Sequence, residues 1–406
     1  MIAIIMSMYL ALSIALYLLM RVYLKGNVAN LFREPVSLAL LGLFVIHGVL
    51  PLVQYPTGMY RYEPGGYSLF AHSYSIALAL VFAVVMVGAY SMSGRTTGQS
   101  ELPVLLPMSG MGILYLLCCV ALPGMIAAAI FYRSIMAFGF DAWAADRILF
   151  SDVKAAGLSS LVCHWLYIAF VASGAGYFTS PGRSKGMLLM FMTLGAMVIV
   201  FFGFIQSRNA ISCSFLTAMG IYFVTSPRSR ITLKSVIFSR VAIVICILFV
   251  VMVVVQQMRP QPKEAKYDSM PMTVLKVVNG VFGNHENVLW MTDHEFEFTY
   301  GATYVAGLVN LYPRAFWPDK PFGAGPYMKN LVDPGSYYAG GKGMSSLTTG
   351  MVTEAYMNGG LIGVVLCAVV TGVVLRGLTI FRSKCHGPWA MAVYCYSALM
   401  LGFSMT

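Results

Sequence analysis

Apolar runs of about twenty residues recur along almost the whole chain and alternate with short connectors rich in basic residues. A helix needs about 20 mostly apolar residues to cross roughly 30 Å of hydrocarbon, so each run is a candidate membrane span. Charged residues make up only 10% of the chain, whereas an average soluble domain carries about 25%. We therefore expect an all-α, polytopic integral membrane protein.

Ten runs qualify as candidate spans. They are Ile2–Met20, Val36–Val53, His72–Tyr90, Met111–Phe131, Leu158–Phe178, Met187–Ile205, Ala210–Thr225, Val241–Gln257, Val352–Leu375 and Pro388–Thr406. No basic segment precedes the first apolar run and no small-residue cleavage site follows it, so we expect no cleaved signal peptide.

Basic residues are distributed unevenly between the two sets of connectors. If the amino terminus starts outside, thirteen lie in inner connectors and five in short outer ones. The inner set is Arg21, Lys25, Arg33, Arg95, Arg183, Lys185, Arg228, Arg230, Lys234, Arg240, Arg376, Arg382 and Lys384; the outer set is Arg61, Arg133, Arg147, Lys154 and Arg208. The positive-inside rule then places the long polar segment 258–348 on the extracytoplasmic side.

This topology divides the chain into three parts. Residues 1–257 form a bundle of about eight transmembrane helices, residues 258–348 form one large extracytoplasmic loop, and residues 349–406 form the C-terminal transmembrane helices. The net charge of +11 belongs to the connectors and not to one patterned face, so we expect no nucleic-acid partner.

Several classes of site are excluded by motif. The eight cysteines lie in spans or in an inner connector, and no Cys or His spacing suits a metal. No phosphate-binding glycine loop is present, so we expect no metal, no nucleotide and no cofactor.

No Asp or Glu lies at the centre of a span, although ion-coupled transporters commonly keep one there. We interpret His47 and His164 as helix-packing histidines that bond to a neighbouring carbonyl.

Arg208 lies in the tight outer turn between two apolar runs, at the depth of a lipid headgroup. Its fork of donors suits a phosphate group bidentately. From spacing alone, an anchoring arginine that reaches toward lipid explains it as well.

The large loop carries the densest acid and base groups of the chain. Residues 272–282 have helical apolar spacing and predict an interfacial amphipathic helix. Residues 283–298 follow with His285, His294, Asp293 and several glutamates, which predict a general base, a group that binds the acceptor, or a solvated acidic segment.

Three prolines within nine residues stiffen the segment Pro313–Pro321, with the sequence PRAFWPDKP. They restrict Arg314, Trp317 and Lys320, a combination that suits an anionic headgroup with a stacked sugar. Downstream, Thr353–Gly360 reads TEAYMNGG and leads into a span.

Together, the PRxxWPxKP segment, the Glu-Ala-Tyr-x-Asn-x-Gly motif, the turn at Ser207-Arg208 and the many spans resemble the O-antigen and oligosaccharide repeat-unit polymerases of the Wzy type. Residue-level similarity runs from about residue 310 to 363. Members often continue beyond the last span, so the end at Thr406 suggests a minimal or shortened member.

The resemblance implies a metal-independent glycosyltransferase with GT-C-like architecture in the bacterial inner (cytoplasmic) membrane. Such enzymes transfer a glycan en bloc from one undecaprenyl-diphosphate carrier to a repeat unit on another, at the outer, periplasmic face. The implied partners are this donor and acceptor, membrane lipids and a chain-length regulator of the Wzz type.

The same resemblance suggests roles for particular residues. Arg208, Arg314 and Lys320 stabilise the leaving diphosphate. The general base is Glu354, His294 or Asp293, although a carboxylate near a helix start such as Glu354 is also explained by the macrodipole. Trp317, Tyr337 and Tyr338 bind the glycan. The two tyrosines lie in a glycine-rich tract that is either a flap over the glycan or an unstructured surface loop. An O-antigen ligase and a lipid-linked glycan transporter are the alternatives.

Overall fold

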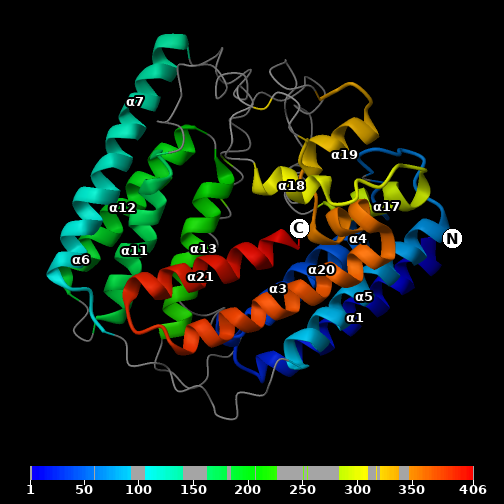
Figure 1. Cartoon of the computed structure of the whole chain (residues 1–406), viewed down its shortest axis with the longest axis horizontal. Coiled ribbons are helices and arrows are strands. Elements are labelled where there is room, and N and C mark those ends of the chain that lie inside the picture. Colours follow the sequence, from blue (N-terminus) through cyan, green and yellow to red (C-terminus); the bar gives the residue numbers. More distant parts are fainter. Residues whose placement is uncertain are drawn as a thin grey trace.

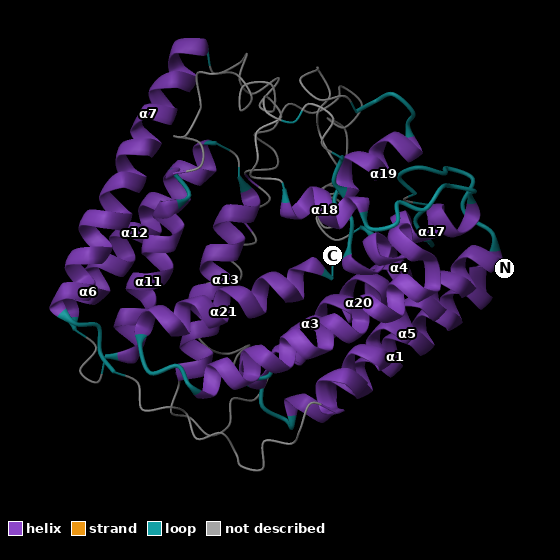
Figure 2. Ribbon diagram, viewed as in Figure 1, coloured by secondary structure: helices purple, strands orange, loops and turns teal. Residues whose placement is uncertain are grey.

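The computed structural model describes most of the chain. It covers residues 2–58, 60–92, 106–139, 162–180, 184–205, 207–225, 250, 254, 283–309, 317, 321–337 and 347–405. Every regular element within these ranges is helical, as the sequence predicts (Figure 2).

Most of the described helices follow the apolar runs, and α2, α17, α18 and α19 are short helices between them. They are α1 (Ile2–Leu24), α2 (Asn30–Arg33), α3 (Pro35–Leu43), the π-helix η1 (Phe44–Val49), α4 (Leu50–Gln54), α5 (Leu69–Met92), α6 (Gly110–Tyr115), the π-helix η2 (Leu116–Ala121), α7 (Leu122–Phe138), α11 (Trp165–Thr179), α12 (Lys185–Phe204), α13 (Arg208–Thr225), α17 (His285–Asp293), α18 (Ala302–Leu308), α19 (Ala324–Val332), α20 (Met351–Ser383) and α21 (Pro388–Ser404).

Six of the described helices are long and apolar enough to cross a membrane. They are α1, the continuous helix α3–η1–α4, α5, the continuous helix α6–η2–α7, α12 and α20. Three further predicted spans are shorter helices, α11, α13 and α21, and the predicted span Val241–Gln257 lies outside the described residues apart from Val250 and Val254. The described part of the chain is thus all-helical, with six candidate membrane-spanning helices. The predicted total of ten spans stays a prediction.

The helices form two groups (Figure 1). One group contains α1, α3–α4, α5 and α20, with α20 packed along α5. The other contains α6–α7, α11, α12 and α13. Helix α21 packs on both α3 and α13 and so joins the groups.

Each π-helix ends two residues before a proline. Pro51 lies in the first turn of α4, after η1, and Pro123 lies in the first turn of α7, after η2. A proline lacks the N–H that an α-helix needs and clashes with the carbonyl one turn earlier. A single wider turn ahead of the proline lets the helix continue across the membrane.

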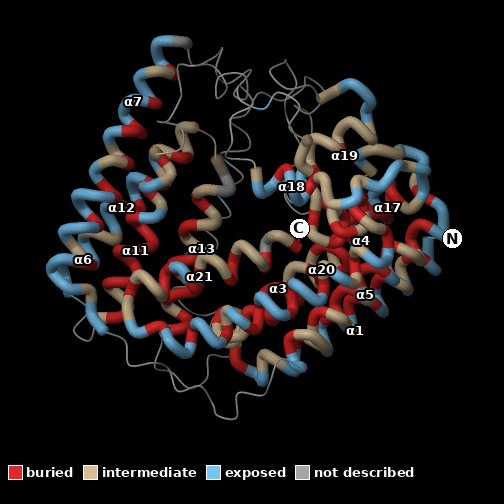
Figure 3. The backbone as a smooth tube through the Cα atoms, viewed as in Figure 1, coloured by how far each residue is buried: buried red, intermediate tan, exposed pale blue. Residues whose placement is uncertain are grey.

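The helices carry many exposed residues on their outward side (Figure 3), and a large share of these are large apolar side chains. On α20, Ile362, Leu366 and Val370 recur at intervals of four residues and are 73%, 61% and 62% exposed. Such a stripe is unfavourable in water and compatible with lipid. On the opposite side of α20, a Cβ atom on Gly372 would lie 2.4 Å from the carbonyl oxygen of Met86, so glycine permits the close contact with α5.

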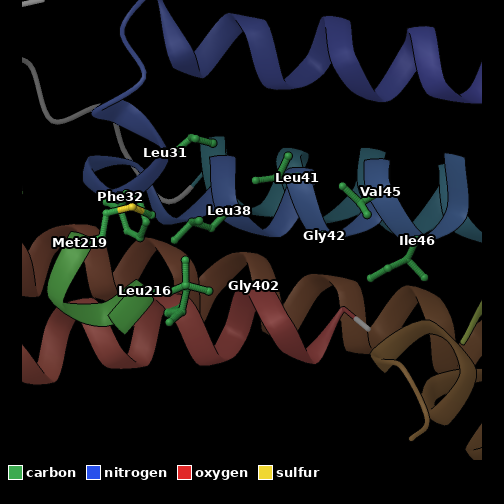
Figure 4. A pocket seen from close by; sticks show the side chains of 11 residues that line it. Leu31, Phe32, Leu38, Leu41, Gly42, Val45, Ile46, Leu216, Met219 and Gly402 are labelled. Atoms are coloured by element: carbon green, nitrogen blue, oxygen red, sulfur yellow. The ribbon is translucent and has the colours of Figure 1, made fainter. Parts of the chain in front are cut away.

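An apolar cavity of about 260 Å³ lies where α3, α13 and α21 meet (Figure 4). Leu38, Ile46, Leu216 and Gly402 are among its lining residues. The carbonyl oxygen of Gly402 would be 2.6 Å from a Cβ atom on Gly42, so α21 crosses α3 at backbone contact. With a purely apolar lining, this cavity offers no group for catalysis.

The two ends of the first helix group differ in chemistry. At one end, Arg382 donates to the carbonyl oxygen of Arg33 and lies 3.9 Å from Glu34. At the other end, the connector 55–68 packs against α17. We call this second end the α17 end; the amino terminus lies beside it (Figure 1).

Candidate functional site

Helix α20 is broken two turns after it begins, and the break fixes the position of Glu354. Gly359 and Gly360 have non-helical backbone angles, and Gly360 has φ +56° and ψ −143°. This region of backbone space is essentially restricted to glycine. The segment that carries Glu354 is therefore separated from the long remainder of α20.

Asn358 ties the end of this short segment to the chain just before α18. Its Oδ1 accepts hydrogen bonds from the Thr299 hydroxyl at 2.7 Å and the Gly301 backbone N–H at 2.8 Å. Its Nδ2 donates to Thr303 Oγ1 at 2.7 Å and to the carbonyl oxygen of Glu354 at 2.8 Å. All polar atoms of this amide are engaged, so Asn358 holds α18 and the start of α20 in a fixed relation.

Thr303 completes a directed chain of hydrogen bonds that ends at Glu354. Its hydroxyl accepts from Asn358 and donates to Glu354 Oε1 at 2.9 Å. A hydroxyl has one hydrogen to donate, so Glu354 Oε1 is an acceptor here. A half-buried carboxylate with one oxygen fixed in this way can receive a proton from a substrate hydroxyl at its other oxygen.

Glu286 lies on the first turn of α17 and is almost fully buried. Its Oε1 accepts from the backbone N–H groups of Arg61 at 2.6 Å and Tyr62 at 2.9 Å, and from the Tyr67 hydroxyl at 3.1 Å. Burial raises the pKa of Glu286, and the three donors and the Arg61 charge lower it in part. The carboxyl group therefore anchors the connector 55–68 and has little access to substrate.

Asn287 extends the same anchoring. Its Oδ1 accepts from the Tyr62 hydroxyl at 2.8 Å, and its Nδ2 donates to the carbonyl oxygen of Thr348 at 2.8 Å. The interpretation of residues 283–298 as a solvated segment is wrong for the first half, because residues 284–291 are buried. The second half, from Asp293, is exposed as that interpretation expects.

Asp293 and His294 lie at the exposed end of α17. The Ser68 hydroxyl donates to Asp293 Oδ1. The His294 ring stacks on Trp290 with centroids 4.4 Å apart, and its Nε2 lies 3.4 Å from Glu63 Oε1. No hydrogen bond among the described residues joins either side chain to Glu354, so the three predicted bases do not form one cluster there.

The remaining predicted site residues are only partly described. Arg314, Lys320 and Tyr338 lie outside the described residues, as do the amphipathic segment 272–282 and most of Pro313–Pro321. Arg208 begins α13, but its side chain is outside the described part. Trp317 is 39% exposed. Tyr337 follows α19, where its backbone exchanges two hydrogen bonds with the Asn330 amide and its ring meets Phe322.

Sequence reasoning missed the partners of Glu354. Asn358 stands four residues after Glu354 and hence on the same helix face, which is a usable signal. Thr303 is 51 residues before Glu354 and carries no signal of its own.

It also missed a buried cluster around His285. His47 Nδ1 lies 2.7 Å from His285 Nδ1, so His47 does not bond to a neighbouring carbonyl as predicted. His164 is separate from this cluster. It lies at the start of α11, and its ring is 5.4 Å from that of Phe202.

Comparison of the chain with protein-family models, with curated proteins and with solved structures gave no match.

Proposed function

We propose that the chain polymerises undecaprenyl-diphosphate-linked oligosaccharide repeat units, as an O-antigen or similar surface-polysaccharide polymerase of the bacterial inner membrane. The proposal is supported by the resemblance of residues 310–363 to such polymerases. The single structural observation that carries it is the fixed carboxyl group of Glu354, placed at the α17 end of a span.

In the proposed reaction, a hydroxyl group of the acceptor glycan attacks the anomeric carbon of the donor. The new glycosidic bond forms as the bond from that carbon to the diphosphate breaks. The hydroxyl proton passes to Glu354, and undecaprenyl diphosphate leaves with the electron pair. This transfer involves no oxidation or reduction, so it needs no electron donor or acceptor.

The other predicted residues take complementary roles in this proposal. Arg208, Arg314 and Lys320 offset the negative charge that grows on the leaving diphosphate. The rings of Trp317, Tyr337 and Tyr338 stack on sugars. Asp293 and His294 then lie at the outer edge of the site, because their side chains already contact Ser68, Trp290 and Glu63.

The test is reconstitution of the full chain in lipid with synthetic undecaprenyl-diphosphate repeat units, followed by gel analysis of the products. A ladder of oligomers is expected, and it should vanish in Glu354→Gln. Glu295→Gln is the matched control, because Glu295 is exposed and its amide variant should keep the ladder. Products found only on a lipid A core, or substrate moved across the bilayer without transfer, would replace this proposal by a ligase or a transporter.

A further inference from the structure

Four buried side chains from four different elements meet near the α17 end. Tyr9 comes from α1, His47 from η1, His72 from α5 and His285 from α17, and each is at most 1% exposed. They take no part in the proposed glycosyl transfer. The first three lie within helices that are long and apolar enough to span a membrane.

The four side chains are joined in a single line by three short hydrogen bonds. His47 Nδ1 lies 2.7 Å from His285 Nδ1, His285 Nε2 lies 2.7 Å from the Tyr9 hydroxyl, and the Tyr9 hydroxyl lies 2.9 Å from His72 Nδ1. The order is therefore His47, His285, Tyr9, His72. The rings meet edge to face, with 79° between His47 and His285 and 88° between Tyr9 and His72.

When the Tyr9 hydroxyl uses its hydrogen within the line, hydrogen-bond chemistry allows two neutral arrangements. A neutral imidazole has one donor and one acceptor nitrogen, and His285 uses both of its nitrogens in the line. If His47 donates to His285, then His285 donates to Tyr9 and Tyr9 donates to His72. If His72 donates to Tyr9, every bond runs the other way. The two arrangements contain the same number of hydrogen bonds and no charge.

Ser75 favours one of the two arrangements. Its hydroxyl donates to the carbonyl oxygen of His72 at 2.9 Å, so its only hydrogen is already in use. The same oxygen lies 3.4 Å from His285 Nε2 and can only accept there. A proton on His285 Nε2 is thereby favoured, which is the arrangement that runs from His47 to His72.

Both ends of the line have a nitrogen left over. Nε2 of His47 and Nε2 of His72 are buried, and neither has a hydrogen-bond partner among the described residues. Buried polar groups are rarely left unsatisfied, so each end suits one further hydroxyl group or water molecule.

The line also has a direction relative to the membrane. His72 is three residues from the start of α5, and His47 is seven residues before the end of α4. At 1.5 Å per residue these positions are about 5 Å and about 10 Å from their helix ends. Ser68 donates a hydrogen bond to exposed Asp293, and its carbonyl oxygen accepts from the backbone N–H of His72, so this end of the line lies near the surface. At the other end, the hydroxyl of Ser13, buried in α1, lies beside Gly48, the residue after His47.

We infer that His47, His285, Tyr9 and His72 form a proton relay between the surface at the α17 end and the interior of the bundle. A proton that arrives on His47 Nε2 releases the Nδ1 proton of that ring to His285 Nδ1. The Nε2 proton of His285 then passes to Tyr9, the Tyr9 hydroxyl proton passes to His72 Nδ1, and the Nε2 proton of His72 leaves. One proton has crossed, and the line now has its opposite arrangement.

Neutrality before and after transfer is what makes a buried relay feasible. A charge held permanently on His285 would lie in a fully buried site beside two other rings, at a high desolvation cost. A merely structural cluster would instead keep one fixed arrangement.

The test is nitrogen-15 NMR of the full chain in lipid nanodiscs, with labelled histidine. Replacing His164, His294 and His386 by Gln leaves only the three histidines of the relay, because the chain has six. The relay predicts that His47, His72 and His285 each populate two exchanging tautomers. Tyr9→Phe should remove this exchange, while Tyr17→Phe, an exposed tyrosine on the same helix, should leave it unchanged.

Two further variants keep the outcome decisive. His72→Gln breaks the line at its end and should also fix His285 in one tautomer, which matters if Tyr9→Phe does not fold. Ser75→Ala should shift His285 toward the tautomer with its proton on Nδ1. A single tautomer on every ring of the otherwise unaltered line, unaffected by Tyr9→Phe or Ser75→Ala, would overturn the relay and leave a static packing cluster.

Discussion

The hydroxyl group of Thr303 lies 2.9 Å from Oε1 of Glu354 and receives a hydrogen bond from Asn358 at 2.7 Å, so α18 supports the carboxyl group that starts α20. This relation makes the site an assembly of two helices. It also makes the orientation of Glu354 dependent on a residue far away in the sequence.

Thr303→Val keeps the shape of this side chain and removes its hydroxyl. The Asn358 amide then loses an acceptor and Glu354 loses a donor, and each loss costs about 1–3 kcal/mol in a buried setting. We expect lower thermal stability and a clear loss of transfer activity, measured by unfolding in lipid and by the product ladder. In the control Thr292→Val, the lost hydroxyl bonds only to backbone carbonyl oxygens, and activity should persist. Full activity in Thr303→Val would show that Glu354 needs no support.

Gly360→Ala tests the break in α20. The positive φ of this residue and the Phe298 ring, 3.3 Å from the position of a new Cβ atom, both oppose a side chain. We expect a loss of about 1–3 kcal/mol in the free energy of unfolding. Gly377→Ala in the same helix meets open space and should be neutral or slightly stabilising. Equal stability of the two variants would mean that the break is not required.

The His285 side chain should make stability dependent on acid. Burial, and then the neighbouring rings of His47 and His72, hold the pKa of His285 well below its usual range. The unfolded chain therefore binds a proton near pH 6.5 that the folded chain rejects. Stability is full above about pH 6.5, and each pH unit below it costs up to about 1.4 kcal/mol for this group.

Thermal unfolding in lipid between pH 7.5 and pH 5.5 measures this effect. The transition temperature should fall with pH, and His285→Asn should show a smaller fall from a lower starting value. Parallel curves for the two proteins would contradict the assignment.

Glu286 should behave with the opposite sign. Burial raises its pKa, so its contribution is present at low pH and is lost as pH rises through the folded-state value. Glu286→Gln keeps an acceptor oxygen for Arg61, Tyr62 and Tyr67 and removes the charge. We expect this variant to equal or exceed the original protein in stability at pH 8. Glu286→Ala instead leaves these donors without their acceptor. One hydrogen bond contributes about 1 kcal/mol, and this variant should lose several times that amount of unfolding free energy. Similar losses in both variants would argue for a structural need for the charge itself.

Local features of the sequence account for most of the helical architecture. Apolar runs predict where helices α1, α5, α12 and α20 lie, because the length and composition of a span are properties of consecutive residues. Pro51 and Pro123 mark the two places where a helix widens into a π-turn. The sequence also predicts that Glu354 lies at the start of a span, as the structure shows.

Contacts between distant segments could not be predicted in this way. Consecutive residues predict a helical membrane protein, the approximate positions of its main spans and a carboxyl group at the start of one of them. The packing of distant segments is what brings Thr303 to that carboxyl group, buries Glu286 under the connector 55–68, and places Tyr9 against His285, 276 residues away. The reason is physical: apolar length is encoded locally, whereas the partner of a buried polar atom is set by which helices pack together and at what rotation.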